Sequence, residues 1–258
     1  MNDAELALLP VFLPLAGAAM ALFAKTVRGN RVATALESMG AVVGLALPWV
    51  ALAYLLPTVR DGGISFTVSG WDSAIGISQR FDGLAWLVDA LGFAGAGAAY
   101  LYSRGAGPKG PLFTAVFLIQ TSALAATAST ADLFNLFVCL EMLGLASYVL
   151  VGSSQKPGAF LAAFSYLTVS SAAMVFFLIG LFGFYRLTGS LAYQGIADGL
   201  AAIPDSGRAA AALSTACIVA AIAIRVAVMP VYGWLPDAHA LAPHAVSAVL
   251  SGVLIKTP

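Results

Sequence analysis

Long apolar runs separated by short polar segments dominate this sequence. A helix that crosses a bilayer needs about 20 mostly apolar residues, and about eight runs approach that length. The first six cover residues 6–24, 32–56, 83–102, 112–127, 133–151 and 160–185. A seventh begins near residue 208 and an eighth near residue 244. The pattern predicts an all-α fold, a polytopic bundle of transmembrane helices.

A break is predicted within the seventh run. Pro230, Gly233 and Pro236 cannot all lie in one continuous helix, because proline removes a backbone donor and clashes with the preceding turn. Backbone groups freed inside a membrane must be satisfied by protein or by water. Broken helices often mark binding sites in transporters. We therefore expect these three residues to mark a functional break.

The loop charges predict an orientation. If the helices alternate in direction, the polar stretch 57–82 and a loop with Gly189, Pro204 and Asp205 share the side of the N-terminus. The opposite side holds six basic residues and no acid: Lys25, Arg28, Arg31, Arg104, Lys109 and Lys156. The N-terminal side holds four: Arg60, Arg80, Arg186 and Arg208. Since Lys and Arg favour the cytoplasmic side, we expect a plasma-membrane protein with its N-terminus outside.

Composition excludes a soluble protein. Hydrophobic residues make up 60% of the chain and charged residues 9%, whereas a soluble domain has roughly 25% charged residues. The net charge is zero, which gives no basic face for nucleic acid. Cys139 and Cys217 lie in apolar runs and are expected to be inert thiols. The cysteines and histidines form no zinc, haem or iron–sulfur motif, so no metal or cofactor is expected.

Ionisable residues inside the apolar runs are the strongest functional signal. Each costs at least about 2.5–3.5 kcal/mol at mid-membrane, and such residues usually face a cavity or a partner. Glu141 lies about 14 Å from the start of its run and is predicted to bind a proton or a cation. A structural hydrogen bond between helices is the alternative. Glu37 and Asp89 lie nearer helix ends, where interfacial or packing roles are favoured.

Two cations follow on the seventh and eighth runs. Lys256 lies about 20 Å beyond Pro243 if that helix is continuous. Burial lowers the pKa of a lysine and a nearby carboxylate raises it, so a lysine under both influences can bind and release a proton. Arg225 stays protonated, so it is expected to be a fixed positive charge that holds Glu141 ionised or repels a proton on Lys256.

Three polar residues lie close to the predicted break. His239 and His244 have intrinsic pKa values near neutrality and could relay protons, or they could be satisfied interfacial residues. Asp237 either caps the restarted helix, where a carboxylate accepts bonds from free N–H groups, or takes part in a proton path. The residues alone leave these alternatives open.

Two stretches resemble a known family. Residues 234–243 read WLPDAHALAP and residues 246–256 read VSAVLSGVLIK. They resemble the signature of the proton-antiporter superfamily, which includes large membrane subunits of respiratory complex I, of membrane-bound hydrogenases and of Mrp sodium/proton antiporters. The segment DLFNLFV at 132–138, GWDSAIGI at 70–77 and FDGL at 81–84 look most like the D-type Mrp subunit.

The resemblance implies roles for the matching positions. Glu141 matches a glutamate of the fifth helix, and Arg225 matches a lysine of the seventh helix that pairs with it. Lys256 matches a lysine of the eighth helix on the central polar axis. Asp237 and His239 match polar residues that follow the helix break. Together these residues would form a half-channel that admits protons to the membrane centre.

The sequence departs from the family pattern in two respects. Position 225 is Arg where the family usually has Lys, which keeps the charge but removes a titratable step. Family members carry two inverted repeats of five helices. The resemblance implies that residues 1–111 supply three N-terminal helices and that residues 112–258 supply the first repeat, with its last helix incomplete. We expect a truncated sequence, because the eighth run stops in mid-span, or else a second chain that completes it.

Three functions are therefore weighed. The first is a subunit of an Mrp-type antiporter that exchanges protons for sodium along Glu141, Lys256 and His239. The alternative is a proton-pumping membrane subunit of a complex I or hydrogenase, in which other subunits carry out the redox chemistry. A structural membrane scaffold is the third. Each implies membrane lipid and other membrane subunits as partners, and none gives this chain catalytic chemistry of its own.

Overall fold

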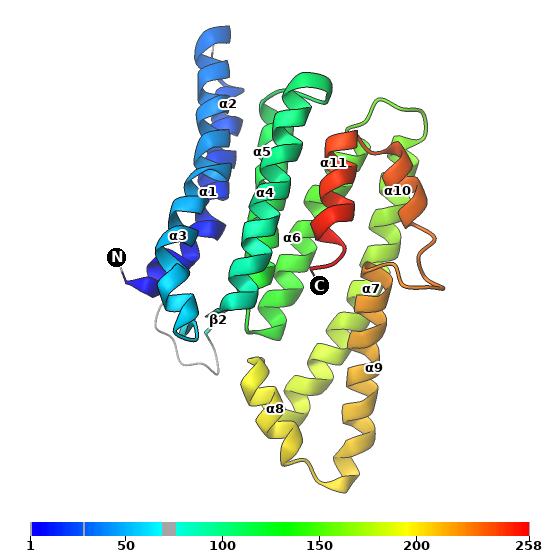
Figure 1. Ribbon diagram of the computed structural model, residues 1–258. Helices are drawn as coiled ribbons and strands as arrows, with labels where there is room; N and C mark the ends of the chain where they lie inside the picture. Colours follow the sequence, from blue (N-terminus) through cyan, green and yellow to red (C-terminus); the bar gives the residue numbers. More distant parts are fainter. Residues whose placement is uncertain (1, 28, 69–75, 258) are drawn as a thin grey trace.

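Seven helices are long and apolar enough to cross a membrane in a computed structural model that describes residues 2–27, 29–68 and 76–257 (Figure 1). Six of these spans are α1 (Asp3–Ala24), α4 (Gly83–Ala106), α5 (Pro111–Ser129), α6 (Leu133–Gly152), α7 (Ala159–Thr188) and α9 (Arg208–Arg225). The other joins α2 (Asn30–Leu45) to α3 (Leu47–Arg60). The predicted all-α transmembrane bundle is confirmed, and the helices begin and end within a few residues of the apolar runs.

The eighth predicted helix is short. α11 (His244–Val249) begins where the sequence indicated and continues as a π-helical turn over Leu250–Leu254. The chain ends halfway down the bundle, beside α6 and α4 (Figure 1). Lys256 therefore lies two residues past the end of the π-helical turn, so the condition of a helix that continues up to this residue is not met.

Most spans pack against the spans that neighbour them in sequence, and α5 lies near the centre of the bundle. α1 contacts α2 and α5, α5 contacts α6, and α7 packs on both α6 and α9. α5 is the most enclosed span, and several of its buried residues are polar. Its Thr121 and Thr127 hydroxyls donate to carbonyl oxygens one turn earlier, at 2.9 and 2.7 Å, so that these polar groups are satisfied within the helix.

The end of the bundle that carries the N-terminus also carries the extra structure. Strands β1 (Ile64–Thr67) and β2 (Ser78–Phe81) pair antiparallel within the predicted polar stretch. Residues 69–75, including most of the GWDSAIGI segment, lie outside the described residues. The predicted loop after α7 is partly wrong, because it contains a short helix, α8 (Tyr193–Ala201). We call this end of the bundle, at the bottom of Figure 1, the hairpin end.

Two glycines allow α1 and α2 to approach closely. A Cβ atom on Gly17 would meet the carbonyl oxygen of Gly40, and a Cβ on Gly40 would meet that of Gly17. Small residues serve this purpose in membrane helices, where backbone approach replaces the hydrophobic effect as the source of affinity.

Replacing Gly17 or Gly40 with alanine is expected to lower the free energy of unfolding by about 1–3 kcal/mol, because the added methyl group forces the two backbones apart. Thermal unfolding of the purified protein in detergent measures the change. Gly97→Ala is the matched control, since Gly97 of α4 has open space around its Cβ position. A similar melting temperature for all three variants would contradict the packing argument.

Candidate functional site

Glu141 lies in the middle of α6, eight residues after Leu133, which corresponds to about 12 Å along the helix. Its side chain is partly buried, and its Oε1 atom is buried without a hydrogen-bond partner among the described residues. An unsatisfied carboxylate oxygen at this depth carries an energetic cost, and residues that are kept at such a cost usually serve a function. The structure thus places Glu141 where the sequence predicted, with one oxygen open to a proton or another ligand.

Arg225 reaches α6 from the last position of α9. Its side chain is buried, and its Nη2 donates to the carbonyl oxygen of Leu140 at 2.7 Å. Gly144 makes room for the guanidinium, because a Cβ there would lie 3.3 Å from the Arg225 Nη1 atom. This Nη1 has no partner within the described part of the chain. Arg225 is therefore anchored by one nitrogen, and its second nitrogen is unpaired.

The expected pairing of Glu141 with Arg225 is electrostatic rather than a direct contact. Arg225 contacts the carbonyl group of Leu140, the residue that precedes Glu141, yet the salt bridges found among residues 2–27, 29–68 and 76–257 lie elsewhere. They join Arg80 to Asp82, Arg104 to Glu37 and Arg208 to Asp205. Arg225 thus lies next to Glu141 on α6 without forming a salt bridge with it.

The helix break is formed by more than its prolines. α9 ends at Arg225, ahead of Pro230 where the sequence predicted the change, and Ala227 has a left-handed backbone with a φ of 55°. The chain restarts as α10 (Leu235–Leu241) with Pro236 in its first turn, where the missing N–H group costs nothing. Asp237 makes no side-chain cap there, because Trp234 occupies the cap position.

Three aromatic residues connect the break to α6 and α7. The Trp234 ring stacks on Tyr166 of α7 with 4.1 Å between centroids, and Tyr166 meets Tyr148 of α6 edge to face at 4.6 Å. Trp234 Nε1 also donates to the carbonyl oxygen of Ile224 at 3.0 Å, which satisfies a group freed by the break. Offset and edge-to-face ring pairs add about 0.5–1.5 kcal/mol each. The start of α10 is therefore held firmly against the bundle.

The remaining predicted residues lie on α10, on α11 and just after the π-helical turn. His239 Nδ1 lies 3.0 Å from Ser247 Oγ of α11. Lys256 Nζ donates to the carbonyl oxygen of Ser251. Asp237 and His244 are exposed at the chain surface. The structure places Arg225 next to Glu141 on α6 and His239 against Ser247 of α11, but it does not bring all of the predicted residues into one site.

The two acids given packing roles behave differently. Glu37 accepts a hydrogen bond from Thr114 Oγ1 at 2.8 Å and forms an ion pair with Arg104 at 3.2 Å, which joins α2 to α4 and α5 as expected. Asp89 of α4 is only 2% exposed, and neither of its carboxylate oxygens has a partner in the described structure. Asp89 therefore makes no side-chain hydrogen bond to a neighbouring helix within the described residues, and its interfacial or packing role stays a prediction.

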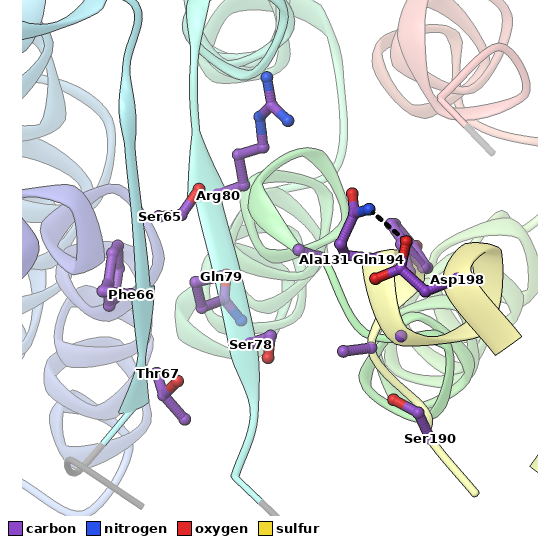
Figure 2. A pocket seen from close by; sticks show the side chains of 13 residues that line it. Ser65, Phe66, Thr67, Ser78, Gln79, Arg80, Ala131, Ser190, Gln194 and Asp198 are labelled. Atoms are coloured by element: carbon purple, nitrogen blue, oxygen red, sulfur yellow. Dashed lines mark hydrogen bonds between the residues drawn. The ribbon is translucent and has the colours of Figure 1, made fainter. Parts of the chain in front are cut away.

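A polar pocket of about 660 Å³ opens at the hairpin end, near the start of α6 (Figure 2). Its walls come from the two strands, from Ala131 and from α8, where Gln194 Nε2 donates to Asp198 at 2.9 Å. The sequence pattern did not reveal this pocket, because its walls come from segments far apart along the chain. Water in this pocket would lie near the start of α6, and Glu141 follows about 12 Å along that helix.

The sequence also did not indicate that Lys156, in the loop between α6 and α7, supports α10. Its Nζ donates to the carbonyl oxygens of Ala240 at 2.9 Å and Ala242 at 3.4 Å, at the C-terminal end of α10. A cation there satisfies free carbonyl groups and complements the helix dipole. The side chain thus ties the restarted helix to the loop.

Replacing Lys156 with methionine is expected to loosen α10. A cation at a helix C-terminus contributes about 0.3–1 kcal/mol, so amide hydrogen exchange over residues 235–241 should accelerate roughly two- to fivefold. Hydrogen-exchange mass spectrometry of the assembled protein measures this rate. Lys109→Met, in the loop between α4 and α5, is the control and should leave α10 unchanged. Equal amide exchange rates over residues 235–241 in the two variants would contradict the role of Lys156 as a support for α10.

The fold and the site together define a polytopic membrane protein with ionisable residues gathered at a broken helix. Residues 129–257 match the family described as NADH:quinone oxidoreductase/Mrp antiporter, transmembrane region. This chain therefore belongs to that family, as the motif around the helix break indicated. The match begins at the end of α5 and covers α6 to the π-helical turn.

Curated relatives come from both branches of the family. The chain is 37% identical over 175 residues to NADH-quinone oxidoreductase subunit N of Desulforudis audaxviator (strain MP104C), which covers 67% of this chain and 34% of the relative. It is 34% identical over 165 residues to the D-type subunit of a probable K(+)/H(+) antiporter of Rhizobium meliloti (strain 1021), which covers 64% of this chain and 30% of that one. The chain thus spans about a third of the curated relatives it matches.

Two solved structures share the fold along nearly the whole chain. A chain of the Mrp complex from Dietzia sp. DQ12-45-1b is similar with a TM-score of 0.79 and 28% identity over 97% of this chain and 46% of that one. A chain of an archaeal respiratory complex, the membrane-bound sulfane sulfur reductase, gives a TM-score of 0.85 at 23% identity, over 99% of this chain and 51% of that one. The latter likeness concerns the fold alone.

Proposed function

We propose that this chain carries ion translocation in a cation/proton antiporter of the Mrp type, where protons move along buried charged residues in exchange for sodium. The observation that carries the proposal is the placement of Arg225, at a helix break, beside Glu141 in the middle of α6. Each has a buried atom without a partner among the described residues. A carboxylate held beside a permanent cation can take up and release a proton when nearby charges change.

A route through the remaining residues follows from this geometry. Protons would enter from the hairpin end, where the polar pocket lies near the start of α6. They would pass from Glu141 past the aromatic cluster to His239 and Lys256, with Arg225 as the fixed charge. Asp237 and His244, which are exposed near α10 and α11, would continue the route toward the opposite end or toward further protein.

A second function is favoured by a specific observation, the 37% identity to subunit N of an NADH-quinone oxidoreductase. In that case the chain is a proton-pumping membrane subunit of a redox-driven complex. The same buried charges would move protons, and other subunits would supply the electron-transfer chemistry. Both functions require further membrane subunits in a plasma membrane, with the N-terminus outside in accordance with the loop charges.

The two functions are separated by one experiment on membrane vesicles that contain the chain with its natural partners. A pH gradient is imposed artificially with no electron donor present, and sodium, potassium or choline is then added. Dissipation of the gradient by sodium but not by choline supports the antiporter. A response to sodium that is no larger than the response to choline, together with proton pumping on addition of NADH or another donor, favours the redox complex.

The role of this chain is tested in the same vesicles with Lys256→Ala. We expect this variant to assemble and to lose cation-dependent proton flux, because the second charged group is removed. Assembly is measured by co-purification of the partner subunits. Unchanged flux in an assembled complex would mean that ions pass elsewhere and that this chain is a scaffold.

A further inference from the structure

We propose that Asp89 is a further proton-binding site of this protein, which holds an exchangeable proton inside the N-terminal helices and is separate from the Glu141 group. Asp89 lies on α4, outside the repeat that carries Glu141, Arg225 and Lys256. It is 2% exposed, and both carboxylate oxygens lack a hydrogen-bond partner among the described residues. The inference rests on this geometry and does not depend on the proposed antiport.

The surroundings of Asp89 are apolar. One turn before it and one turn after it on α4, Ala85 and Phe93 belong to a buried hydrophobic cluster with residues of α1, α3 and α5. Gly92, three residues on, is packed against Leu124 of α5. An ionised carboxylate without a donor is expensive in such a place, and a bound proton removes the charge.

The donors closest along these helices are already used. Trp86 Nε1 donates to the carbonyl oxygen of Leu52 at 2.8 Å. On α5, Ser122 Oγ donates to the carbonyl oxygen of Val11 at 2.7 Å, and Thr127 donates within its own helix. A sodium ion would need several oxygen ligands around it, whereas Asp89 belongs to no group of three or more metal-ligating side chains among the described residues. The site therefore fits a proton better than a metal cation.

Within the described part of the chain, no opposite charge on a neighbouring element is placed to pair with Asp89. α5 carries no ionisable side chain. The other elements packed on α4 are α2, α3, α11, β2 and the π-helical turn, and their ionisable residues are Arg31, Glu37, Tyr54, Arg60, Arg80 and His244. All of these are exposed except Glu37, which is bound to Arg104 and Thr114. α1 shares the apolar cluster with Ala85 and Phe93, and its ionisable residues are the acids Asp3 and Glu5, which supply no opposite charge. Lys256, which follows the π-helical turn, is exposed as well.

The proton has its shortest route to water at the hairpin end. Asp89 lies six residues from Gly83 and seventeen from Ala106, which corresponds to about 9 and 26 Å along α4. A buried polar pair, Ser129 Oγ donating to Gln79 Oε1 at 3.0 Å, lies at that end. Gln79 also lines the polar pocket, where Figure 2 shows it on β2.

Infrared spectroscopy of the assembled complex with ¹³C-labelled aspartate carboxyls tests the assignment. At neutral pH the wild type should show the C=O stretching band of a protonated carboxyl group, and Asp89→Asn should lose it. The band should shift when the sample is moved into D₂O and should not respond to sodium. Asp82→Asn is the matched control, because Asp82 caps the same helix and pairs with Arg80; it should lose only carboxylate bands.

Three outcomes would overturn the proposal. A labelled wild type with carboxylate bands alone would do so without any variant, even if Asp89→Asn failed to assemble. Conversion of the acid band to a carboxylate band by sodium would make Asp89 a metal-cation site. An acid band that never exchanges in D₂O would mean a locked proton with no access to water. Because the spectrum needs no transport, its result is separate from the test of the antiporter.

Discussion

Replacing Glu141 with glutamine is expected to abolish proton movement through the complex while leaving its assembly intact. Glutamine has nearly the same size and retains hydrogen-bonding groups, but it cannot bind and release a proton. Because Glu141 is the acid nearest the middle of α6 and has an unpartnered Oε1 atom, no other carboxylate in that helix replaces it. Proton flux in vesicles with the natural partners measures the loss.

The matched control for this prediction is Glu37→Gln. Glu37 is also a buried glutamate, but its carboxylate is engaged by Arg104 and Thr114, so the substitution should weaken packing and spare proton flux in the complexes that assemble. Equal flux in the Glu141→Gln complex and the wild type would remove Glu141 from the path. Equal loss in both variants would point to a general structural effect.

Replacing Arg225 with methionine is expected to produce the second large effect, a loss of both stability and transport. The change removes the hydrogen bond to the Leu140 carbonyl and leaves Glu141 without its neighbouring cation. Removing one partner of a buried charge pair costs about 3–5 kcal/mol. Because this pair is not in direct contact, we expect a value near the lower limit. Thermal unfolding in detergent and proton flux in vesicles measure the two effects.

Arg225→Lys separates charge from geometry. Lysine keeps the positive charge and is the residue that the family resemblance implies at this position, so transport should be largely retained, whereas the planar fork that reaches Leu140 is lost. Arg186→Met controls for removal of an arginine, because Arg186 is exposed near the end of α7. Retained flux in Arg225→Met would show that the fixed charge is dispensable.

The candidate site was predictable in its residues but not in its contacts. Glu141, Arg225 and Lys256 were identified because a charge in an apolar run is rare and costly. That Arg225 binds the Leu140 carbonyl, and that His239 meets Ser247, depends on how α6, α9, α10 and α11 are packed. Asp89 was given a packing role because a sequence does not reveal whether a buried acid finds a donor.

The amino-acid sequence was sufficient to predict the limits of the long helices, because the bilayer requires about 20 apolar residues for each span. It was also sufficient to predict that the seventh helix breaks, since proline cannot continue a helix. Helix packing, in contrast, sets the end of α9 at Arg225, the support of α10 by Lys156 and the pocket lined by the hairpin and α8. These features depend on contacts between residues that are far apart in the chain. Such contacts form, and stabilise the structure, only when the helices are packed together.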